Sequence, residues 1–477
     1  MRGPRRHRWT GWPRWPSWPW WAAVAFVALI AAGVVFGRDT GVDEGHAPAR
    51  GKRIVTDFDG DGHADLAVPA PLSTVGGVRR AGSVSVVYGG RAGPDIRRAQ
   101  VVDRTAKGRL GELAAREEQF GADAVARDLD GDGFTDLATG RTVLWGSADG
   151  LTTGSRLPAG GVRGGDFDGD GHADLLAADL TVRYGPFGRD GKPDRTVPKP
   201  RSSFGDQQVP RTVTVGDLTG DGRDDVVTGQ GFEEMQNRGY FFQGRSKGLA
   251  REPVELRTYN GDGVVGDVDG DGYGDLVVRE IGRVAEGLDQ FKGEIRVLRG
   301  SPAGPKGEGT LVDLDTAGVP GVAAPGDEFG AALAAGDVDG DRRADLAVGV
   351  PGRGGGKGGV VLLRGSRSGL TGTGAGFFGQ ETPGVPGTGE HGDRFGGALR
   401  LADLTGDGRP ELVVGAAGED GAHRDSGAVW VLRGAPSGPV ARGAASFGPA
   451  TLGAPERGTD GRLSEWPGTY FGGGFPG

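Results

Sequence analysis

Short apolar runs and acidic, glycine-containing loops alternate along most of this chain. Around residue 340, EFGAALAAGD leads into an acidic loop, ADLAVGVP leaves it, and GGVVLLRGS comes after a glycine-rich turn. Apolar runs of about four to eight residues bounded by glycine are typical of β-strands. The pattern therefore predicts a first strand, an acidic loop, a second strand, a turn and a third strand, in that order.

This unit occurs seven times. Its loops begin at residues 57, 128, 166, 217, 267, 337 and 403, and a third-strand run such as VVLLRGS or VWVLRGA comes after each loop. The loops start about 60 residues apart on average, which leaves room for a fourth strand in the variable stretch before the next unit. Open solenoids usually have shorter repeats, whereas four-stranded units arranged radially form a β-propeller. We therefore predict an all-β, seven-bladed β-propeller, with the tightest blade between residues 128 and 166.

The loops have the form D-x-[DT]-G-D-x-x-x-[DE]. Ca²⁺ is held by several oxygens at about 2.3 to 2.6 Å, which alternate carboxylates on a tightly turned loop can supply. Without a cation, carboxylates this close would repel one another. The expected ligands are the side chains at positions one, three, five and nine and the backbone carbonyl of position seven, for up to seven Ca²⁺ ions. They are Asp57, Asp59, Asp61, His63, Asp65, Asp128, Asp130, Asp132, Phe134, Asp136, Asp166, Asp168, Asp170, His172, Asp174, Asp217, Thr219, Asp221, Arg223, Asp225, Asp267, Asp269, Asp271, Tyr273, Asp275, Asp337, Asp339, Asp341, Arg343, Asp345, Asp403, Thr405, Asp407, Arg409 and Glu411.

Three loops depart from the full pattern. Thr219 and Thr405 stand at position three, where a hydroxyl can bind a cation but brings no charge, so weaker binding is expected there. Arg342 replaces the glycine of position six, where a backbone with positive φ is expected, so its site should be strained or weaker. The alternative for any one loop is a polar β-turn, in which Asp and Gly are common.

A Phe-Gly pair precedes several loops. It occurs eight residues before a loop as Phe120-Gly121, Phe329-Gly330 and Phe395-Gly396, and more loosely as Phe204-Gly205. Together with the acidic loops and the second-strand segments LAVPAP, LAVGVP and LVVGAA, it resembles the FG-GAP repeats of the integrin α-subunit propeller and its bacterial relatives with FG-GAP or VCBS repeats. The resemblance covers residues 51–477 and implies a calcium-binding propeller. Units one, three and five have no clear Phe-Gly pair.

The C-terminus carries a Phe-Gly pair without a loop after it. Tyr470-Phe471-Gly472 ends the chain, while the first loop has no such pair before it. We therefore expect the C-terminal segment, residues 465–475, to lie near residues 51–60 and to close the ring.

The first 50 residues are a different kind of sequence. A basic, Trp- and Pro-rich segment at residues 1–19 precedes an apolar run at residues 20–37, and residues 38–50 form a linker to the propeller at residues 51–477. Basic residues before an apolar run predict a cytoplasmic N-terminus and export of the chain beyond the run. An uncleaved signal anchor is favoured over a cleaved signal peptide, and both place the propeller outside the membrane. The expected location is the cell membrane, with the C-terminal domain extracytoplasmic; otherwise the protein is secreted.

Composition narrows the chemistry. The formal net charge is −9, but 26 of the 64 acidic residues are ligand-position carboxylates in the loops, so the charge does not indicate a basic partner. No run of Lys or Arg reaches five residues, so no nucleic-acid partner is expected. There is no cysteine, which excludes disulfides and thiol catalysis. The 98 glycines indicate many tight turns.

The sequence therefore favours a calcium-stabilised binding or adhesion module with an unidentified protein or glycan ligand at the cell surface. The alternative is an enzyme, a hydrolase or lyase, or a lectin that uses the central channel. It would require His, Glu, Tyr or Arg side chains from several blades to converge there. The segments Gly244-Arg245-Ser246-Lys247-Gly248 and Gly354-x-Gly356-x-x-Gly359 match catalytic and nucleotide-binding spacings, but both are expected to be turns between strands.

Overall fold

The computed structural model describes residues 56–104, 118–158, 160, 163–200, 209–232, 235–258, 260–280, 292–458 and 468–476. Within these residues no helix is both long and apolar enough to cross a membrane. The apolar run at residues 20–37 and its flanking segments lie outside the described part of the chain, as does Phe204-Gly205.

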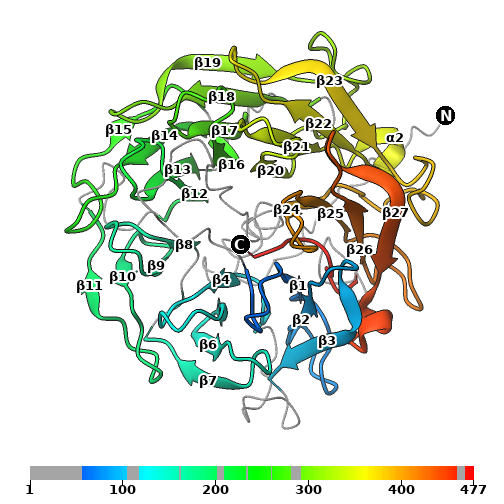
Figure 1. Ribbon diagram of the computed structural model, residues 1–477, viewed down its shortest axis with the longest axis horizontal. Helices are drawn as coiled ribbons and strands as arrows, with labels where there is room; N and C mark the ends of the chain where they lie inside the picture. The colour runs from blue at the N-terminus through cyan, green and yellow to red at the C-terminus, as the bar shows by residue number, and fades with distance from the viewer. Residues whose placement is uncertain are drawn as a thin grey trace, which may run out of the picture.

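Seven antiparallel sheets surround a common axis, as Figure 1 shows. This arrangement confirms the predicted seven-bladed, all-β propeller. Blades 1 to 3 contain β1 (Leu66–Ala70), β2 (Ser83–Tyr88), β3 (Asp95–Asp103), β4 (Val125–Arg127), β5 (Asp136–Thr139), β6 (Thr142–Trp145), β7 (Thr153–Arg156), β8 (Arg163–Gly165), β9 (Asp174–Leu176), β10 (Val182–Tyr184) and β11 (Arg195–Val197). Blades 4 and 5 contain β12 (Thr212–Gly216), β13 (Asp225–Phe232), β14 (Met235–Phe242), β15 (Val254–Glu255), β16 (Asn260–Gly266), β17 (Asp275–Glu280), β18 (Ile295–Arg299) and β19 (Lys306–Val312).

Blades 6 and 7 have the same order of strands. They contain β20 (Leu333–Gly336), β21 (Asp345–Gly349), β22 (Val360–Arg364), β23 (Thr371–Phe378), β24 (Ala398–Ala402), β25 (Glu411–Ala416), β26 (Ala428–Arg433) and β27 (Val440–Phe447). A single helical turn, α2 (Arg353–Gly356), lies between β21 and β22, and η2 (Pro449–Leu452) comes after β27. The Gly354 to Gly359 segment is thus a turn, as expected, although it contains one short helical turn.

Within each blade, each strand pairs with the next one along the chain. Among the described residues blade 1 has three strands, which correspond to the second, third and fourth strands of the four-stranded blades. In blade 6, Leu333 is opposite Val348 and Leu346 is opposite Leu363. The first strand lies nearest the axis and the fourth lies at the rim (Figure 1). The second strands β21 and β25 are buried along their whole length, whereas most of β19 is exposed. The second and third strands are therefore continuous apolar runs because both of their faces are covered by neighbouring blades.

Blades pack on one another through shared apolar clusters. One cluster joins Val277 and Ile295 of blade 5 to Leu333 and Leu346 of blade 6. Because consecutive strands are antiparallel, the acidic loops and the turns between third and fourth strands lie at one end of the ring. We call this end the metal face. The turns between second and third strands and the connections between blades lie at the other end, the variable face.

The Phe-Gly pair forms a repeated clamp between blades. The residue before the phenylalanine has a positive φ in four places, of 53° at Gln119, 60° at Glu328, 61° at Arg394 and 63° at Tyr470. A turn hydrogen bond runs back to each of these residues, for example from Gly397 N–H to the Arg394 carbonyl at 2.9 Å and from Gly473 N–H to the Tyr470 carbonyl at 3.1 Å. The C-terminal turn is therefore built like the internal ones.

The C-terminal segment closes the ring between blades 7 and 1. Leu72 N–H donates to the Thr469 carbonyl at 3.2 Å, and Phe471 is fully buried in a cluster with residues of β1, β25 and β26. The buried Arg400 of β24 donates to the Pro476 carbonyl and, at 2.7 Å, to the Thr56 hydroxyl. The last described residues run toward the axis (Figure 1). These contacts confirm the predicted closure.

Candidate metal centres

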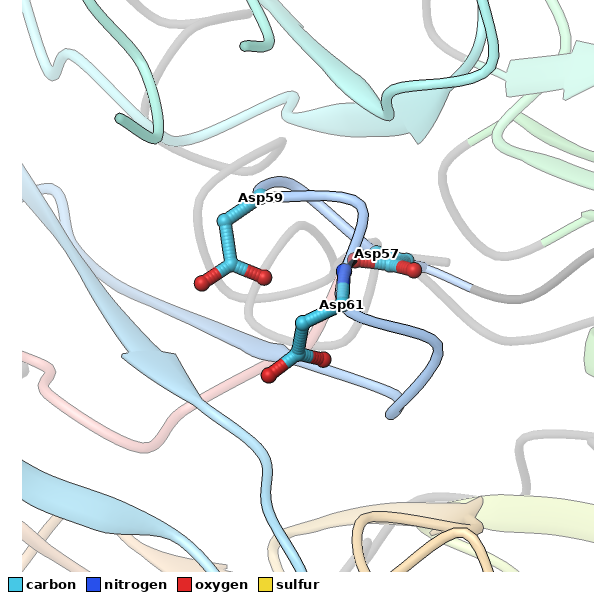
Figure 2. A group of neighbouring side chains, drawn as sticks. All are labelled: Asp57, Asp59 and Asp61. Carbon is cyan, nitrogen blue, oxygen red and sulfur yellow. Dashed lines mark hydrogen bonds between the residues drawn. The ribbon is translucent and has the colours of Figure 1, made fainter. Parts of the chain in front are cut away.

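The first aspartate of each loop organises the turn of the backbone. In the first loop, Asp57 accepts hydrogen bonds from Gly60 N–H at 2.6 Å, Asp61 N–H at 3.2 Å and Gly62 N–H at 2.9 Å. Gly60 and Gly62 have φ of 72° and 87°, so this turn uses the left-handed region that glycine enters without steric cost. Figure 2 shows Asp57, Asp59 and Asp61 on this one turn of chain.

The acidic residue at position nine is buried beneath the loop and ties it to the third strand. Asp65 accepts hydrogen bonds from Phe58 N–H at 2.7 Å and from Gly89 N–H at 2.8 Å, just beyond β2. The same two bonds, from position two and from the glycine after the third strand, occur in all seven loops. This carboxylate therefore fixes the distance between the loop and the blade.

Sequence reasoning missed the role of these glycines. A Cβ added at Gly300 would lie 2.3 Å from the Gly274 carbonyl oxygen, and the corresponding position in blade 1, Gly89, is equally crowded at 2.2 Å from the Ala64 carbonyl. A larger residue could not occupy this position without shifting the backbone. The signal was present in the recurring glycine that ends every third-strand run.

Position three holds the oxygens that fit a cation. Asp59 Oδ1 and Thr219 Oγ1 are buried and have no protein hydrogen-bond partner, in residues that are 7% and 4% exposed. An orphaned buried oxygen is unfavourable unless something outside the protein binds it. The donor set of each loop consists of oxygens alone, which is the set that hard divalent cations prefer. The residues present therefore fit a Ca²⁺ ion.

Carboxylates from the loops come together in five places. Oxygens of three acidic residues lie within 4.8 Å of one another in the groups Asp57, Asp59 and Asp61; Asp128, Asp130 and Asp136; Asp166, Asp168 and Asp174; Asp267, Asp269 and Asp271; and Asp337, Asp339 and Asp345. Within the described residues, the two loops that carry threonine at position three do not form such a group. Several of the predicted ligand sets are thus brought together, and the threonine loops have one carboxylate fewer.

Burial changes the acidity of the position-nine carboxyls. It raises the pKa of Asp65, Asp136 and Asp174 to about 8 each. The pKa of Asp225 and that of Asp275 rise to about 7 for the same reason. Other carboxylates of the same loop add repulsion in each case. A divalent cation at this point would favour the charged form and offset both effects.

Adjacent loops interlock around the metal face. The position-seven side chain of one loop lies against the position-four glycine of the preceding loop: a Cβ on Gly60 would come within 2.5 Å of the Phe134 ring, and one on Gly406 within 2.6 Å of His63. In the same way His172 lies over Gly131. His63 and His172 therefore pack between loops, and neither needs a catalytic role to explain its position.

Backbone hydrogen bonds run around the same ring. The position-eight N–H donates to the position-one carbonyl of the preceding loop, from Thr135 to Asp57 at 2.7 Å and from Ala344 to Asp267 at 2.8 Å. Within the described residues the bond is present at four of the seven joints; it is absent between blades 2 and 3, between blades 4 and 5, and between blades 6 and 7, where Pro410 stands at position eight and has no N–H. No side chain lies within 4 Å of a Cβ placed on Gly340 at the same joint.

Arg342 keeps the loop geometry in spite of its side chain. Its φ is 69°, and its N–H donates to Asp337 at 2.8 Å as glycine does in the other loops. The substitution therefore leaves the hydrogen bond in place and puts strain in the backbone, as expected from the sequence.

The fold and these loops define a β-propeller whose blades each carry an acidic loop of metal-binding type. The FG-GAP repeat family model matches residues 54–87, 209–242, 329–363 and 395–432. Each match contains an acidic loop with the strands next to it. The chain therefore contains four FG-GAP repeats, in agreement with the resemblance seen in its sequence.

Two solved structures are similar to the chain. One is the Tc holotoxin pore of Photorhabdus luminescens, at 16% identity and a TM-score of 0.34, covering 82% of this chain and 15% of that chain. The other is the biofilm matrix protein Bap1 of V. cholerae, at 13% identity and a TM-score of 0.25, covering 82% of this chain and 71% of that one. This chain thus spans only a small part of the holotoxin component.

Proposed function

We propose that this protein is an extracytoplasmic, calcium-stabilised β-propeller that acts as a binding module for a protein or glycan ligand at the cell surface, anchored in the membrane through residues 20–37. The proposal joins the FG-GAP propeller fold to the acidic loops and to the apolar run near the N-terminus. Calcium is plentiful outside the cell, so the proposed calcium binding agrees with the proposed extracytoplasmic location.

One observation carries the calcium part of the proposal. All seven loops share the hydrogen bonds of the position-nine carboxyl, and buried position-three oxygens such as Asp59 Oδ1 have no protein partner. In each loop, positions one, three, five and nine and the carbonyl of position seven would hold Ca²⁺. The ion would supply positive charge that offsets the repulsion among carboxylates, so its role is structural.

Removing calcium tests this role. A ligand that binds only the folded state at 100 times its Kd adds about 2.7 kcal/mol for each site. The full chain should therefore melt at a distinctly lower temperature in excess chelator than in Ca²⁺, with Mg²⁺ as the control cation. An unchanged melting temperature in chelator would overturn the proposal.

The ligand-binding part rests on the variable face. A pocket of about 420 Å³ lies there between blades 6 and 7, lined by Arg353, Lys357, Phe377 and Gln380 among others. It combines an aromatic surface with charged and amide groups, which suits a polar ligand that has one apolar side. The metal face is occupied by interlocking loops, which leaves the variable face for recognition.

Capture of ligands by the full chain, with and without Ca²⁺, tests this part. A ligand should be retained in Ca²⁺ and lost in chelator. The double substitution Lys357→Ala with Phe377→Ala should weaken capture without changing the difference in melting temperature between Ca²⁺ and chelator. Arg367→Ala, an exposed arginine on the metal face, is the matched control. Equal capture by the double variant would place recognition elsewhere on the propeller.

The structure brings one group of charges together near the variable face, as the enzyme or lectin alternative would require. Asp262, Arg279, Glu328 and Arg394 interact electrostatically with one another or with Tyr470. Arg394 forms two hydrogen bonds with Glu328, at 2.6 and 3.1 Å, and burial raises the pKa of Tyr470 to about 12. The Arg394–Glu328 pair is accounted for by the contact between the segments that precede blades 6 and 7.

A further inference from the structure

An arginine contacts position three in each of the five loops that carry aspartate there. Four of the contacts measure 2.7 Å for Arg98 and Asp59, 2.5 Å for Arg189 and Asp130, 2.8 Å for Arg299 and Asp269, and 3.5 Å for Arg364 and Asp339; Arg195 pairs with Asp168 in the fifth. Two of these arginines also contact a second carboxylate of the same loop, Asp132 for Arg189 at 2.5 Å and Asp345 for Arg364 at 3.3 Å. The position-three side chain is nearly buried in four of these pairs.

The arginines reach the loops by two routes. In blades 5 and 6 the arginine is the last residue of the third strand, Arg299 of β18 and Arg364 of β22. In blades 1 to 3 that strand position is aromatic, and the arginine comes from another segment and stacks on the ring. The distances to the ring centroids are 4.9 Å for Arg98 and Tyr88, 5.2 Å for Arg189 and Trp145, and 3.5 Å for Arg195 and Tyr184. Arginines from different segments of the chain therefore all place a positive charge beside the position-three carboxylate.

The two threonine loops lack this contact. In blade 4 the corresponding strand position is the neutral Gln243, whose amide lies 3.5 Å from Asp221. In blade 7 it is Arg433, which donates to the Ala92 carbonyl of blade 1 at 3.5 Å. Within the described residues, an arginine beside position three thus accompanies an aspartate and not a threonine.

The charges explain this correlation. An Asp–Arg pair is formally neutral, as threonine is, so position three adds no net charge in any of the seven loops. Arg223, Arg343 and Arg409 at position seven pair with position five of their own loops, in the sixth loop as well as in the threonine loops. The presence of these position-seven arginines therefore does not depend on whether position three is aspartate or threonine.

We propose that these five arginines are built-in counter-charges that keep position three in place without calcium and lower the Ca²⁺ affinity of their loops. This inference rests on the proposed calcium binding. In loop one the guanidinium of Arg98 holds Asp59 Oδ2, while Oδ1 has no protein partner and is available to the ion. In the other four loops Oδ1 of position three accepts one long hydrogen bond, of 3.2 to 3.3 Å, from the N–H of position five. A positive charge this close repels a divalent cation and stabilises the carboxylates when the cation is absent.

Loop five offers a local reporter. Tyr273 stands at position seven of that loop and can sensitise the luminescence of Tb³⁺, an oxygen-binding stand-in for Ca²⁺. The full chain carrying Arg299→Gln should bind Tb³⁺ at the Tyr273-dependent site about three to ten times more tightly, with Ca²⁺ competing accordingly. Its melting temperature in chelator should fall. Arg299→Lys should restore both the Tb³⁺ affinity and the melting temperature in chelator. Arg433→Gln, at the same strand position next to a threonine loop, should change neither quantity.

A second variant tests the idea without removing an arginine. Thr219→Asp in loop four should lower the melting temperature in chelator, and adding Gln243→Arg should restore it. Unchanged or weaker Tb³⁺ binding by Arg299→Gln would overturn the inference, as would a failure of Gln243→Arg to restore the melt. If the unsubstituted chain shows no emission that Tyr273→Phe removes, the proposed calcium binding fails and this inference fails with it.

Discussion

Arg342 occupies a backbone conformation that the other six loops leave to glycine. Its φ of 69° costs an L-residue about 1 kcal/mol. Arg342→Gly should therefore stabilise the folded chain by about that amount in chemical denaturation, because the N–H bond to Asp337 remains. Arg367→Gly, at an exposed position without positive φ, is the control and should give no gain. A loss of stability in Arg342→Gly would show that the arginine side chain makes a compensating contribution.

Glu419 should make stability depend on pH. Burial raises its pKa to about 7, with further repulsion from Asp393, Glu390 and Asp420, while a hydrogen bond from Gln380 acts in the opposite direction. The folded state thus keeps this proton up to about pH 7, whereas the unfolded state loses it near pH 4.5. The contribution of Glu419 to the free energy of unfolding is therefore fully present below pH 4.5 and is lost as pH rises through 7.

Glu419→Gln should remove that loss. Compared with the unsubstituted chain, we expect the free energy of unfolding of the variant to be about 1 kcal/mol larger at pH 8 than at pH 5, after allowance for solvent screening. Denaturant unfolding at the two pH values measures it, with Glu381→Gln, an exposed carboxylate, as the control. The same pH profile in Glu419→Gln and the unsubstituted chain would contradict the assignment.

At the residue level the sequence identifies the ligand positions because each carboxylate lies within one short loop. It does not identify partners that come from elsewhere in the chain. Arg98 and Asp59 are separated by 39 residues, and Arg189 reaches loop two from the next blade. Such contacts depend on how blades stack, which local spacing does not specify.

At the level of elements, the glycine after each third strand controls how closely a loop lies to its blade. Gly300→Ala would place a Cβ 2.3 Å from the Gly274 carbonyl oxygen. We expect a loss of about 1 to 3 kcal/mol and weaker Tyr273-sensitised Tb³⁺ binding in loop five. Gly376→Ala in β23 meets nothing closer than 3.7 Å and is the matched control. Equal stability of the two variants would show that the loop tolerates displacement.

The order of strands could be predicted from apolar runs and loops, since the second and third strands are buried on both faces. The fourth strands could only be assigned to a region: β19 and β23 are largely exposed or half-buried and rich in glycine. Strands as short as the three-residue β8 and β9 also carry too few residues for a periodic signal. The positions of β8 and β9 in the sheet are fixed by hydrogen bonding to the strands next to them.

At the level of the whole molecule, the C-terminal Phe471 closes the ring in the way that Phe395 joins blades 6 and 7. Phe471 and Phe395 are both fully buried. Phe471→Ala should lower the free energy of unfolding by about 3 to 5 kcal/mol, and Phe395→Ala by a similar amount. Denaturant unfolding compares them with Phe377→Ala, which is 36% exposed and should lose less. If Phe471→Ala resembles Phe377→Ala, the C-terminal clamp contributes little to closure.

Pro410 removes a backbone hydrogen bond from the metal face at the joint between blades 6 and 7, while Arg394 and Glu328 hold these blades together near the variable face. The two edges of this boundary thus differ in strength. A pulling force or a thermal fluctuation should part the blades from the metal face first, with the opposite edge as a pivot. Within the described residues the boundaries between blades 2 and 3 and between blades 4 and 5 also lack the bond, but there His172 and Tyr273 cover the position-four glycine, whereas no described side chain covers Gly340. Amide hydrogen exchange should therefore be fastest, among the inter-blade boundaries, around loops six and seven, and the ring should open at this one boundary.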